Sequence, residues 1–294
     1  MTETLRNITV LGAGTMGRGI AQVAAAAAFE TRIFDVDAQS LTDAKEAIHR
    51  NLDKGMRLGK VTTEVAARTK ENLSLEQDLD SAVSAADLVI EAVPESMELK
   101  VQIFKHVARS APAEAILASN TSGLSITEMA TASGRPDRFG GMHFFNPVHL
   151  MKLVELVRGL ETSEETVATL RWVAESMGKE VVLVNESPGF VTSRVNALIG
   201  NEAFRMLEQG VATARDIDKA LKLGLNHPMG PFEMVDLVGL DVRLSILRHL
   251  NQTLGDLYRP SNLLVQYVQA GRLGRKVGRG VYNYEKDGEV ADQE

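Results

Sequence analysis

The residues best suited to proton transfer lie in the segment GGMHFFNPVHLMKLVELV, residues 140–157. His143 stands in one apolar run and Glu155 in a second, and a polar side chain in such a run is costly unless it is partnered or used. Imidazole exchanges protons near neutral pH, and a neighbouring carboxylate fixes its tautomer and stabilises its protonated form. The two residues are therefore candidates for a base and its charge partner.

The alternation of residue types in MKLVELV is typical of a strand. His143 and Glu155 would then meet if they lay on antiparallel neighbouring strands joined by the NPVHLM turn. At this point the alternative stays open that His143 is a structural core histidine near an exposed glutamate. His149 is a rival base, but its place in the turn beside Pro147 predicts that it is exposed.

A glycine-rich turn near the N-terminus predicts a dinucleotide site. An apolar β-branched run over 8–11 leads into GAGTMG, an alanine-rich helical pattern follows, and a second strand, TRIF, comes next. In this arrangement the first glycine permits a tight turn, the second lets a pyrophosphate approach, and the third lets the helix pack closely on the sheet. The helix N-terminus attracts the phosphates. The expected contacts are Gly12, Ala13, Gly14, Thr15, Met16 and Gly17.

A carboxylate follows the second strand, as ribose recognition requires. Asp35 lies eighteen residues after Gly17, close to the roughly 20 expected for this motif. Its carboxylate would accept hydrogen bonds from a ribose 2′-hydroxyl and repel a 2′-phosphate, so we expect NAD rather than NADP. Arg32 close by is expected to keep that preference from being absolute.

The alternation of strands and helices then resumes. ADLVIEAVPE, AILASNTS and RFGGMHFFNP are typical of strands, and LKVQIFKHVA is typical of a helix. Ligands bind beyond the carboxyl ends of the strands in an open parallel sheet. We therefore expect six polar side chains to line one crevice, namely those of Glu95, Ser119, Asn120, Ser122, His143 and Asn146.

The character of the chain changes near Asn185. A last strand, EVVLV, is followed by Pro188 and Gly189, and then by helical patterns over 193–210, 214–225, 231–255 and 262–271. The predicted fold is α/β, with a doubly wound Rossmann-type sheet domain at 1–185 and an all-helical C-terminal domain at 186–294. The apolar stripes of the helices predict that this second domain completes the active site and forms a homodimer.

A polar, helical arm is predicted at about 38–72, directly after the first half of the dinucleotide domain. It gathers Arg50, Lys54, Arg57 and Lys60. Such a charge run is usually a solvated helix face, but in an acidic protein it also suits an anionic substrate group.

Composition excludes several other functions. The net charge of −7 argues against a nucleic-acid binder, and the lack of cysteine excludes disulfides, thiolate metal sites and thiol nucleophiles. No metal site is expected. No apolar run is long enough for a membrane span and no leader pattern opens the chain, so we expect a cytoplasmic protein.

The motifs taken together resemble the 3-hydroxyacyl-CoA dehydrogenase family over essentially the whole chain. They are GAGTMG, AVPE, SNTS, HFFNPV, MKLVE, PGF, NHPMGPFE and GRKVGRGVYNY, and HFFNPV followed by KLVE is the most specific. The resemblance implies an NAD-dependent enzyme that interconverts (S)-3-hydroxyacyl-CoA and 3-oxoacyl-CoA. Its short-chain bacterial members, which act on 3-hydroxybutyryl-CoA, are the most similar.

The resemblance also implies roles for individual residues. His143 matches the catalytic base, Glu155 its charge partner, Ser122 a residue that touches both substrate and nicotinamide, and Asn146 a nicotinamide contact. Positions that bind NAD or lie beside it match Asp35, Glu95, Lys100 and Lys276. The arm matches the part that holds coenzyme A, which makes Lys54 and Arg57 candidate substrate contacts.

One position departs from the family pattern. After PGF the family often has an asparagine that contacts the acyl oxygen, whereas this chain has Ser193, with Asn196 one helical turn on. Both are candidate substrate contacts, and the change puts chain-length preference and rate in doubt. Two alternatives remain: a related dehydrogenase of a 3-hydroxy acid without coenzyme A, such as a sugar acid or carnitine, and a non-catalytic, crystallin-like relative.

Overall fold

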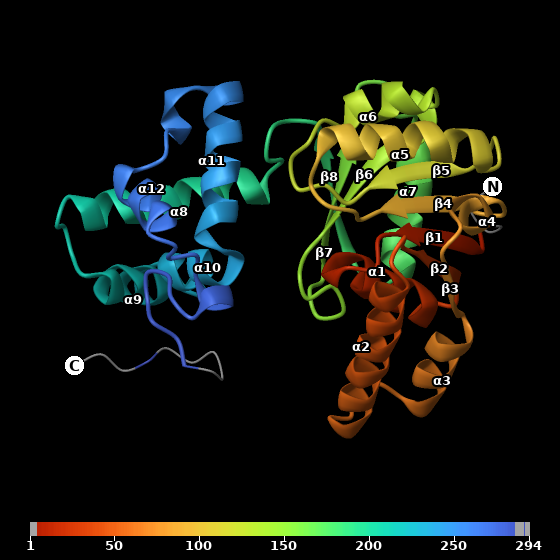
Figure 1. The fold of residues 1–294 in the computed structure, drawn as a ribbon, viewed down its shortest axis with the longest axis horizontal. Helices are drawn as coiled ribbons and strands as arrows, with labels where there is room; N and C mark the ends of the chain where they lie inside the picture. The colour runs from red at the N-terminus through yellow and green to blue at the C-terminus, as the bar shows by residue number, and fades with distance from the viewer. Residues whose placement is uncertain (1–4, 286–290, 292–294) are drawn as a thin grey trace. The chain divides into compact units, whose positions relative to one another are not determined.

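The chain forms two compact units in a computed structural model that describes residues 5–285 and 291. Unit 1 comprises residues 1–187 and unit 2 residues 188–294. The division falls two residues after the predicted one at 185. Figure 1 labels the helices and strands of both units, and each unit has its own core of buried hydrophobic residues.

Unit 1 is built on one eight-stranded sheet with the strand order β3-β2-β1-β4-β5-β6-β7-β8. All neighbouring pairs are parallel except β6 and β7. The order runs outward from β1 in both directions, which is the doubly wound arrangement. The strands are β1 (Asn7–Leu11), β2 (Glu30–Phe34), β3 (Leu73–Glu76), β4 (Leu88–Glu91), β5 (Ile116–Ser119), β6 (Phe139–Phe144), β7 (Leu153–Arg158) and β8 (Glu180–Asn185).

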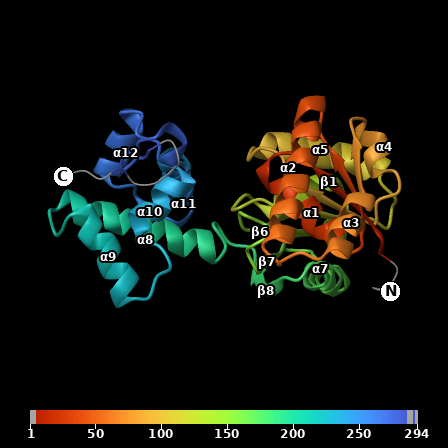
Figure 2. The ribbon, with the colours of Figure 1, turned by 90° about the horizontal axis from the view of Figure 1, so that it is seen from below.

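Helices cover both faces of this sheet. Figure 2 shows α5 (Met97–Ser110) and α7 (Glu164–Ser176) on opposite sides of it. The predicted arm consists of α2 (Ala38–Arg57) and α3 (Thr63–Glu71), which pack on each other and on α1 (Thr15–Ala26). The remaining helices of the unit are α4 (Leu79–Val83), α6 (Ile126–Ser133) and the short η2 (Pro136–Arg138).

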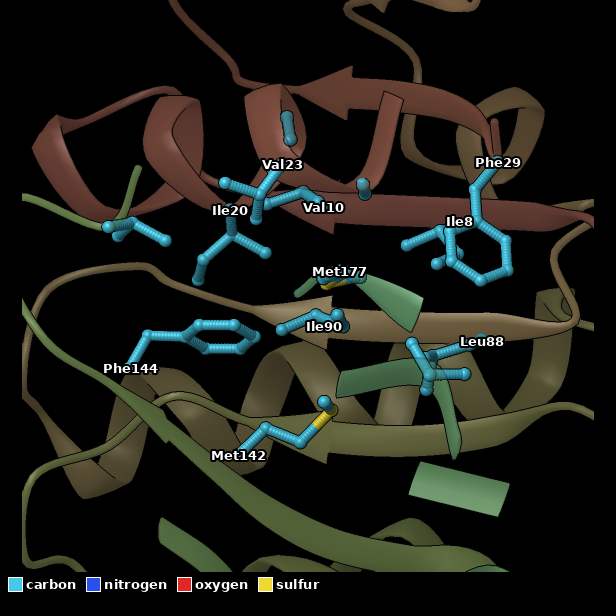
Figure 3. Packing of buried hydrophobic residues seen from close by; sticks show 14 of the residues in the cluster. Ile8, Val10, Ile20, Val23, Phe29, Leu88, Ile90, Met142, Phe144 and Met177 are labelled. Carbon is cyan, nitrogen blue, oxygen red and sulfur yellow. The ribbon is translucent and has the colours of Figure 1, made fainter. Parts of the chain in front are cut away.

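The larger core cluster lies between the sheet and the helices α1 and α7. Alternate residues of the strands contribute to it, as expected for a pleated sheet. Figure 3 shows this packing for Ile8, Val10, Ile20, Val23, Phe29, Leu88, Ile90, Met142, Phe144 and Met177. The residues between these strand positions, including His143 and Glu155, therefore point to the opposite face of the sheet, on which α5 lies.

Unit 2 is helical. Its elements are α8 (Thr192–Glu208), α9 (Ala214–Gly224), α10 (Pro231–Val238), α11 (Leu240–Leu254), η3 (Asp256–Tyr258), α12 (Asn262–Gln269) and η4 (Arg275–Val277). The single helix expected over 231–255 is two helices, because Gly239 between them has a left-handed φ of 108°. The predicted fold class, a Rossmann-type sheet domain followed by a helical domain, is confirmed. No helix in the described part of the chain is long and apolar enough to span a bilayer; a cytoplasmic location stays a prediction.

Candidate active site

Four buried polar side chains lie on one face of the sheet near its carboxyl edge. Glu91 ends β4, and it is paired in register with Ser119 at the end of β5, which is paired in turn with Gly141 of β6. Two residues further along β6, His143 is paired with Glu155 of antiparallel β7. The sheet register thus places a row of polar groups where ligands of such folds bind.

His143 and Glu155 are in direct contact. Nδ1 of His143 lies 2.8 Å from Oε2 of Glu155, and the two side chains are 7% and 1% exposed. An ionised carboxylate can only accept, so the geometry assigns the Nδ1 proton to this bond and the acceptor lone pair of the neutral imidazole to Nε2. The ring of Phe145 covers the imidazole, at 4.5 Å between ring centroids. This arrangement fits a base held in one tautomer by a buried charge.

The glycine loop fits a dinucleotide. Gly12 has a left-handed φ of 102°, and a Cβ on Gly17 would lie 1.8 Å from the carbonyl oxygen of Gly12, so the turn demands glycine at both positions. A Cβ on Gly14 would meet no atom within 4 Å, so space is open above it. Gly14 also caps α1 without any side-chain hydrogen bond, which leaves the helix N-terminus open to an anion.

Asp35 directly follows β2 and is fixed against this loop. One carboxylate oxygen accepts from the backbone N–H of Ala13 at 2.8 Å and the other from that of Asp37 at 3.0 Å. The guanidinium of Arg32 does not lie beside the carboxylate of Asp35, because it donates to the carbonyl oxygens of Ser81 and Ala82. That pairing removes the reason for expecting Arg32 to moderate the cofactor preference.

We expect Asp35→Ser to narrow the preference of the protein for NADH over NADPH. Repulsion between the carboxylate and a 2′-phosphate is worth a few kcal/mol in a partly desolvated site, and serine removes it. The measurement is kcat/KM for NADH and for NADPH, in the variant and in the unmodified protein. Asp37→Ser is the matched control, because Asp37 caps α2 and serine also serves as an N-cap. If the unmodified protein used NADPH better than NADH, this interpretation of Asp35 would be wrong.

Glu95 and Lys100 belong to a connected network at the ends of β4 and β5. The ammonium group of Lys100 lies 2.6 Å from Oε1 of Glu91 and 3.2 Å from Oε2 of Glu95. Glu91 is fully buried, and it also accepts from the hydroxyl of Ser119 and the N–H of Val93. Burial raises the pKa of Glu91 above its usual value, although Lys100 and the other donors oppose that shift. A direct contact of Lys100 with NAD stays a prediction.

Glu95 ties this network to the loop that carries Ser122. It accepts from the hydroxyl of Thr121 and from the backbone N–H of Ser122 at 2.9 Å. The hydroxyl of Thr121 in turn accepts from the N–H of Leu124. Ser122 itself is exposed. The AVPE and SNTS loops are therefore one hydrogen-bonded assembly, which the sequence motifs did not reveal.

Two residues expected in the crevice form buried hydrogen bonds within unit 1, and their place in the crevice stays a prediction. Ser119 is fully buried and donates to Glu91, and Asn120 accepts from the N–H of Phe144, which extends the pairing of β5 with β6. Asn146 and His149 are exposed in the turn between β6 and β7. Partial burial and the ammonium groups of Lys179 and Lys54 lower the pKa of His149.

Three of the four basic residues expected in the arm lie on α2, and Lys60 follows the end of that helix. Arg50, Lys54 and Arg57 line a hollow together with Asn51 and Asp53. Arg50 also pairs with Glu46 one turn earlier on the helix. The lining of the hollow therefore carries three cations, one amide and one carboxylate, and its net positive charge suits a phosphate-bearing ligand.

The candidate residues of unit 2 lie on its helices. Ser193 and Asn196 are half-buried in the first turns of α8. Lys276, in η4, is paired with Asp241 in the first turn of α11 at 2.6 Å. Their roles stay predictions. Within residues 5–285 and 291, no group of three or more histidine or acidic side chains is placed to hold a metal ion.

Comparison with known proteins identifies the family. The family model described as 3-hydroxyacyl-CoA dehydrogenase, NAD binding domain, matches residues 7–187 of this chain. The family model described as 3-hydroxyacyl-CoA dehydrogenase, C-terminal domain, matches residues 189–284. The chain is 47% identical to a probable 3-hydroxybutyryl-CoA dehydrogenase of Bacillus subtilis, over 96% of this chain and 98% of that one. It is 39% identical to the mitochondrial hydroxyacyl-coenzyme A dehydrogenase of Sus scrofa, over 95% of this chain and 91% of that one.

A solved structure extends this likeness to the fold. The (S)-3-hydroxybutyryl-CoA dehydrogenase of Ralstonia eutropha matches with a TM-score of 0.93 and 41% identity, over 96% of this chain and all of that one. The chain therefore belongs to the 3-hydroxyacyl-CoA dehydrogenase family of NAD-dependent oxidoreductases.

Proposed function

We propose that the protein interconverts (S)-3-hydroxyacyl-CoA and 3-oxoacyl-CoA esters of short chain, with His143 as the base and Glu155 as its charge partner. The observation that supports this most directly is the 2.8 Å contact between their buried side chains at the carboxyl edge of the sheet. The open glycine loop lies at the same edge, after β1.

In the oxidative direction, the 3-hydroxyl proton of the substrate passes to Nε2 of His143. The imidazolium that forms is stabilised by the carboxylate of Glu155, which also holds the ring in the required orientation. NAD, when bound, supplies the acceptor for the hydride that leaves C3. In the reductive direction His143 returns the proton to the new alkoxide oxygen, so one residue serves both directions.

The substrate class is supported by α2 and by the relatives. The hollow formed by Arg50, Lys54 and Arg57 carries the positive charge that the phosphates of coenzyme A require. Relatives of similar length are named 3-hydroxybutyryl-CoA dehydrogenases, which favours a four-carbon acyl group. A relative in Escherichia coli at 40% identity is named 3-hydroxyadipyl-CoA dehydrogenase, so a dicarboxylic ester belongs in any test.

A substrate panel followed by NADH absorbance tests the proposal. We expect the highest kcat/KM with acetoacetyl-CoA, lower values with longer 3-oxoacyl-CoA esters and with the 3-oxoadipyl ester, and no turnover of free 3-hydroxy acids with NAD. Turnover of free acids but not of coenzyme A esters would favour the non-CoA alternative. A lack of turnover with every compound would favour the crystallin-like one.

We also propose that the protein is a homodimer through unit 2. Large apolar side chains near the junction of α10 and α11 are exposed, namely Leu237, Val238 and Val242. Closed two-fold dimers are the commonest way in which soluble proteins cover such surface. We expect twice the chain mass by light scattering at micromolar concentration. A monomeric mass under those conditions would refute the dimer.

A further inference from the structure

Lys179 is a buried cation whose hydrogen bonds go to backbone carbonyl groups. It lies between α7 and β8 and is buried, and none of the salt bridges among the residues that the structure describes includes it. Burial lowers its pKa. A buried ammonium group is costly unless hydrogen bonds compensate for the lost water, so the acceptors of Lys179 are needed to keep it inside this fold.

Its hydrogen bonds go to the turn between β6 and β7. The Nζ atom donates to the carbonyl oxygen of Val148 and, at 2.8 Å, to that of Met151. Within this turn the N–H groups of Leu150 and Met151 both donate to the carbonyl oxygen of Pro147. The segment is therefore a tight hydrogen-bonded turn, and Lys179 donates hydrogen bonds to two of its backbone carbonyl groups.

The same turn packs on the helix of the glycine loop. The side chain of Val148 is buried, and a Cβ on Gly19 of α1 would lie 2.9 Å from its Cβ and Cγ2 atoms. Gly19 is not one of the three glycines of the GxGxxG motif. Its lack of a side chain lets the turn approach α1 more closely than any other residue would allow.

We propose that Lys179 and Gly19 are positioning residues for the reaction: Lys179 ties the β6–β7 turn to the segment before β8, Gly19 lets the turn pack on α1, and together they fix His143 relative to the glycine loop. The turn begins shortly after His143 and leads into β7, which carries Glu155. The N-terminus of α1 is where the dinucleotide is proposed to bind. A displacement of about 1 Å between a base and a bound reactant is enough to lower a rate by about 10²-fold. The inference rests on the proposed function of unit 1.

The test compares Lys179→Met with Lys179→Arg. We expect Lys179→Met to lower kcat for acetoacetyl-CoA reduction by about 10- to 100-fold, because the turn loses the two bonds that hold it. NADH should bind more weakly, whereas ADP-ribose, which lacks nicotinamide, should bind as it does to the unmodified protein. Lys179→Arg keeps the charge and donors, so it should recover a large part of the lost rate.

Gly19→Ala tests the other side of the turn without removing a charge. The added methyl group must push Val148 away, so kcat and NADH binding should fall in the same pattern. Gly224→Ala is the matched control, because that glycine of α9 has no atom within 4 Å of a Cβ, and it should leave the rate unchanged. The single tryptophan, Trp172, lies in α7, and its fluorescence on urea titration reports whether unit 1 remains folded.

Two results would overturn the proposal. One is an unchanged kcat in both Lys179→Met and Gly19→Ala. The other is an equal loss of NADH and ADP-ribose binding together with easier unfolding, because that would be general destabilisation. If the unmodified protein turned over no substrate, the proposed function would fail, yet the comparison of NADH with ADP-ribose would still test the positioning.

Discussion

A His143→Gln variant is expected to lose about 10²- to 10⁴-fold in kcat while it binds NADH as the unmodified protein does. Glutamine has a similar size and retains hydrogen bonding, but it cannot take up the hydroxyl proton of the substrate. The glycine loop that is proposed to bind NAD lies on β1 and α1, on other elements than His143. The measurements are NADH oxidation with acetoacetyl-CoA and a fluorescence titration with NADH.

Glu155→Gln is expected to be damaging as well, because an amide cannot stabilise the imidazolium by charge. The double variant should be little worse than His143→Gln alone, since the two side chains form one unit through the bond between Nδ1 and Oε2. Additive losses in the double variant would show that Glu155 acts on something other than His143.

Two other histidines provide matched controls. His149 is exposed in the β6–β7 turn, and His106 is exposed on α5, where it pairs with Asp80. Replacement of either by glutamine should leave the rate close to that of the unmodified protein. An unchanged kcat in His143→Gln would refute the proposed mechanism. A large loss of kcat in His149→Gln would indicate that His149 is the base.

The register of β6 and β7 explains why the sequence alone predicts the central pair. A strand-like run, a short turn with proline and a second alternating run predict antiparallel neighbours, and one register then sets His143 opposite Glu155. The glycine motif is equally local, since its strand, turn and helix follow one another directly. Features determined by neighbouring residues in the chain were therefore predictable.

Contacts between distant segments were not. Lys179 reaches carbonyl groups about 30 residues earlier in the chain, and backbone carbonyls leave no mark on the sequence. Ser119 lies opposite Glu91 in the register of β4 and β5 and donates a hydrogen bond to it, and the two residues are 28 positions apart in the chain. The strand ADLVIEAVPE did contain a signal: Glu91 is a carboxylate inside an apolar run, which is the kind of feature that singled out His143. The same argument applied there would have predicted a buried partner for Glu91.

That buried partner leads to a large effect on stability. Lys100→Met is expected to lower the free energy of unfolding of unit 1 by about 3 to 5 kcal/mol at neutral pH. The side chains of Lys100 and Glu91 are 1% and 0% exposed, so removal of the ammonium group leaves an uncompensated carboxylate in the interior. Urea unfolding followed by Trp172 fluorescence measures the change for unit 1, because Trp172 packs against Phe29 in its core.

The pH dependence distinguishes this cause from a loss of packing. Burial already raises the pKa of Glu91, and Lys100 opposes that shift, so the variant should raise this pKa further. A carboxyl group whose folded pKa exceeds its unfolded value destabilises the fold above the folded pKa, and the cost is relieved as pH falls through it. The deficit of Lys100→Met should therefore shrink as pH falls, because Glu91 takes up its proton at a higher pH in the variant than in the unmodified protein.

A second substitution completes the test. Glu91→Gln in the Lys100→Met background removes the buried charge, so the double variant should recover much of the lost stability at neutral pH. Glu46→Gln, which breaks the exposed pair with Arg50 on α2, is the matched control and should leave the unfolding curve almost unchanged. The loss of stability in Lys100→Met could instead be the same at every pH and persist when Glu91→Gln is added. Lys100 would then stabilise unit 1 by the packing of its side chain, and not by compensating the buried charge of Glu91.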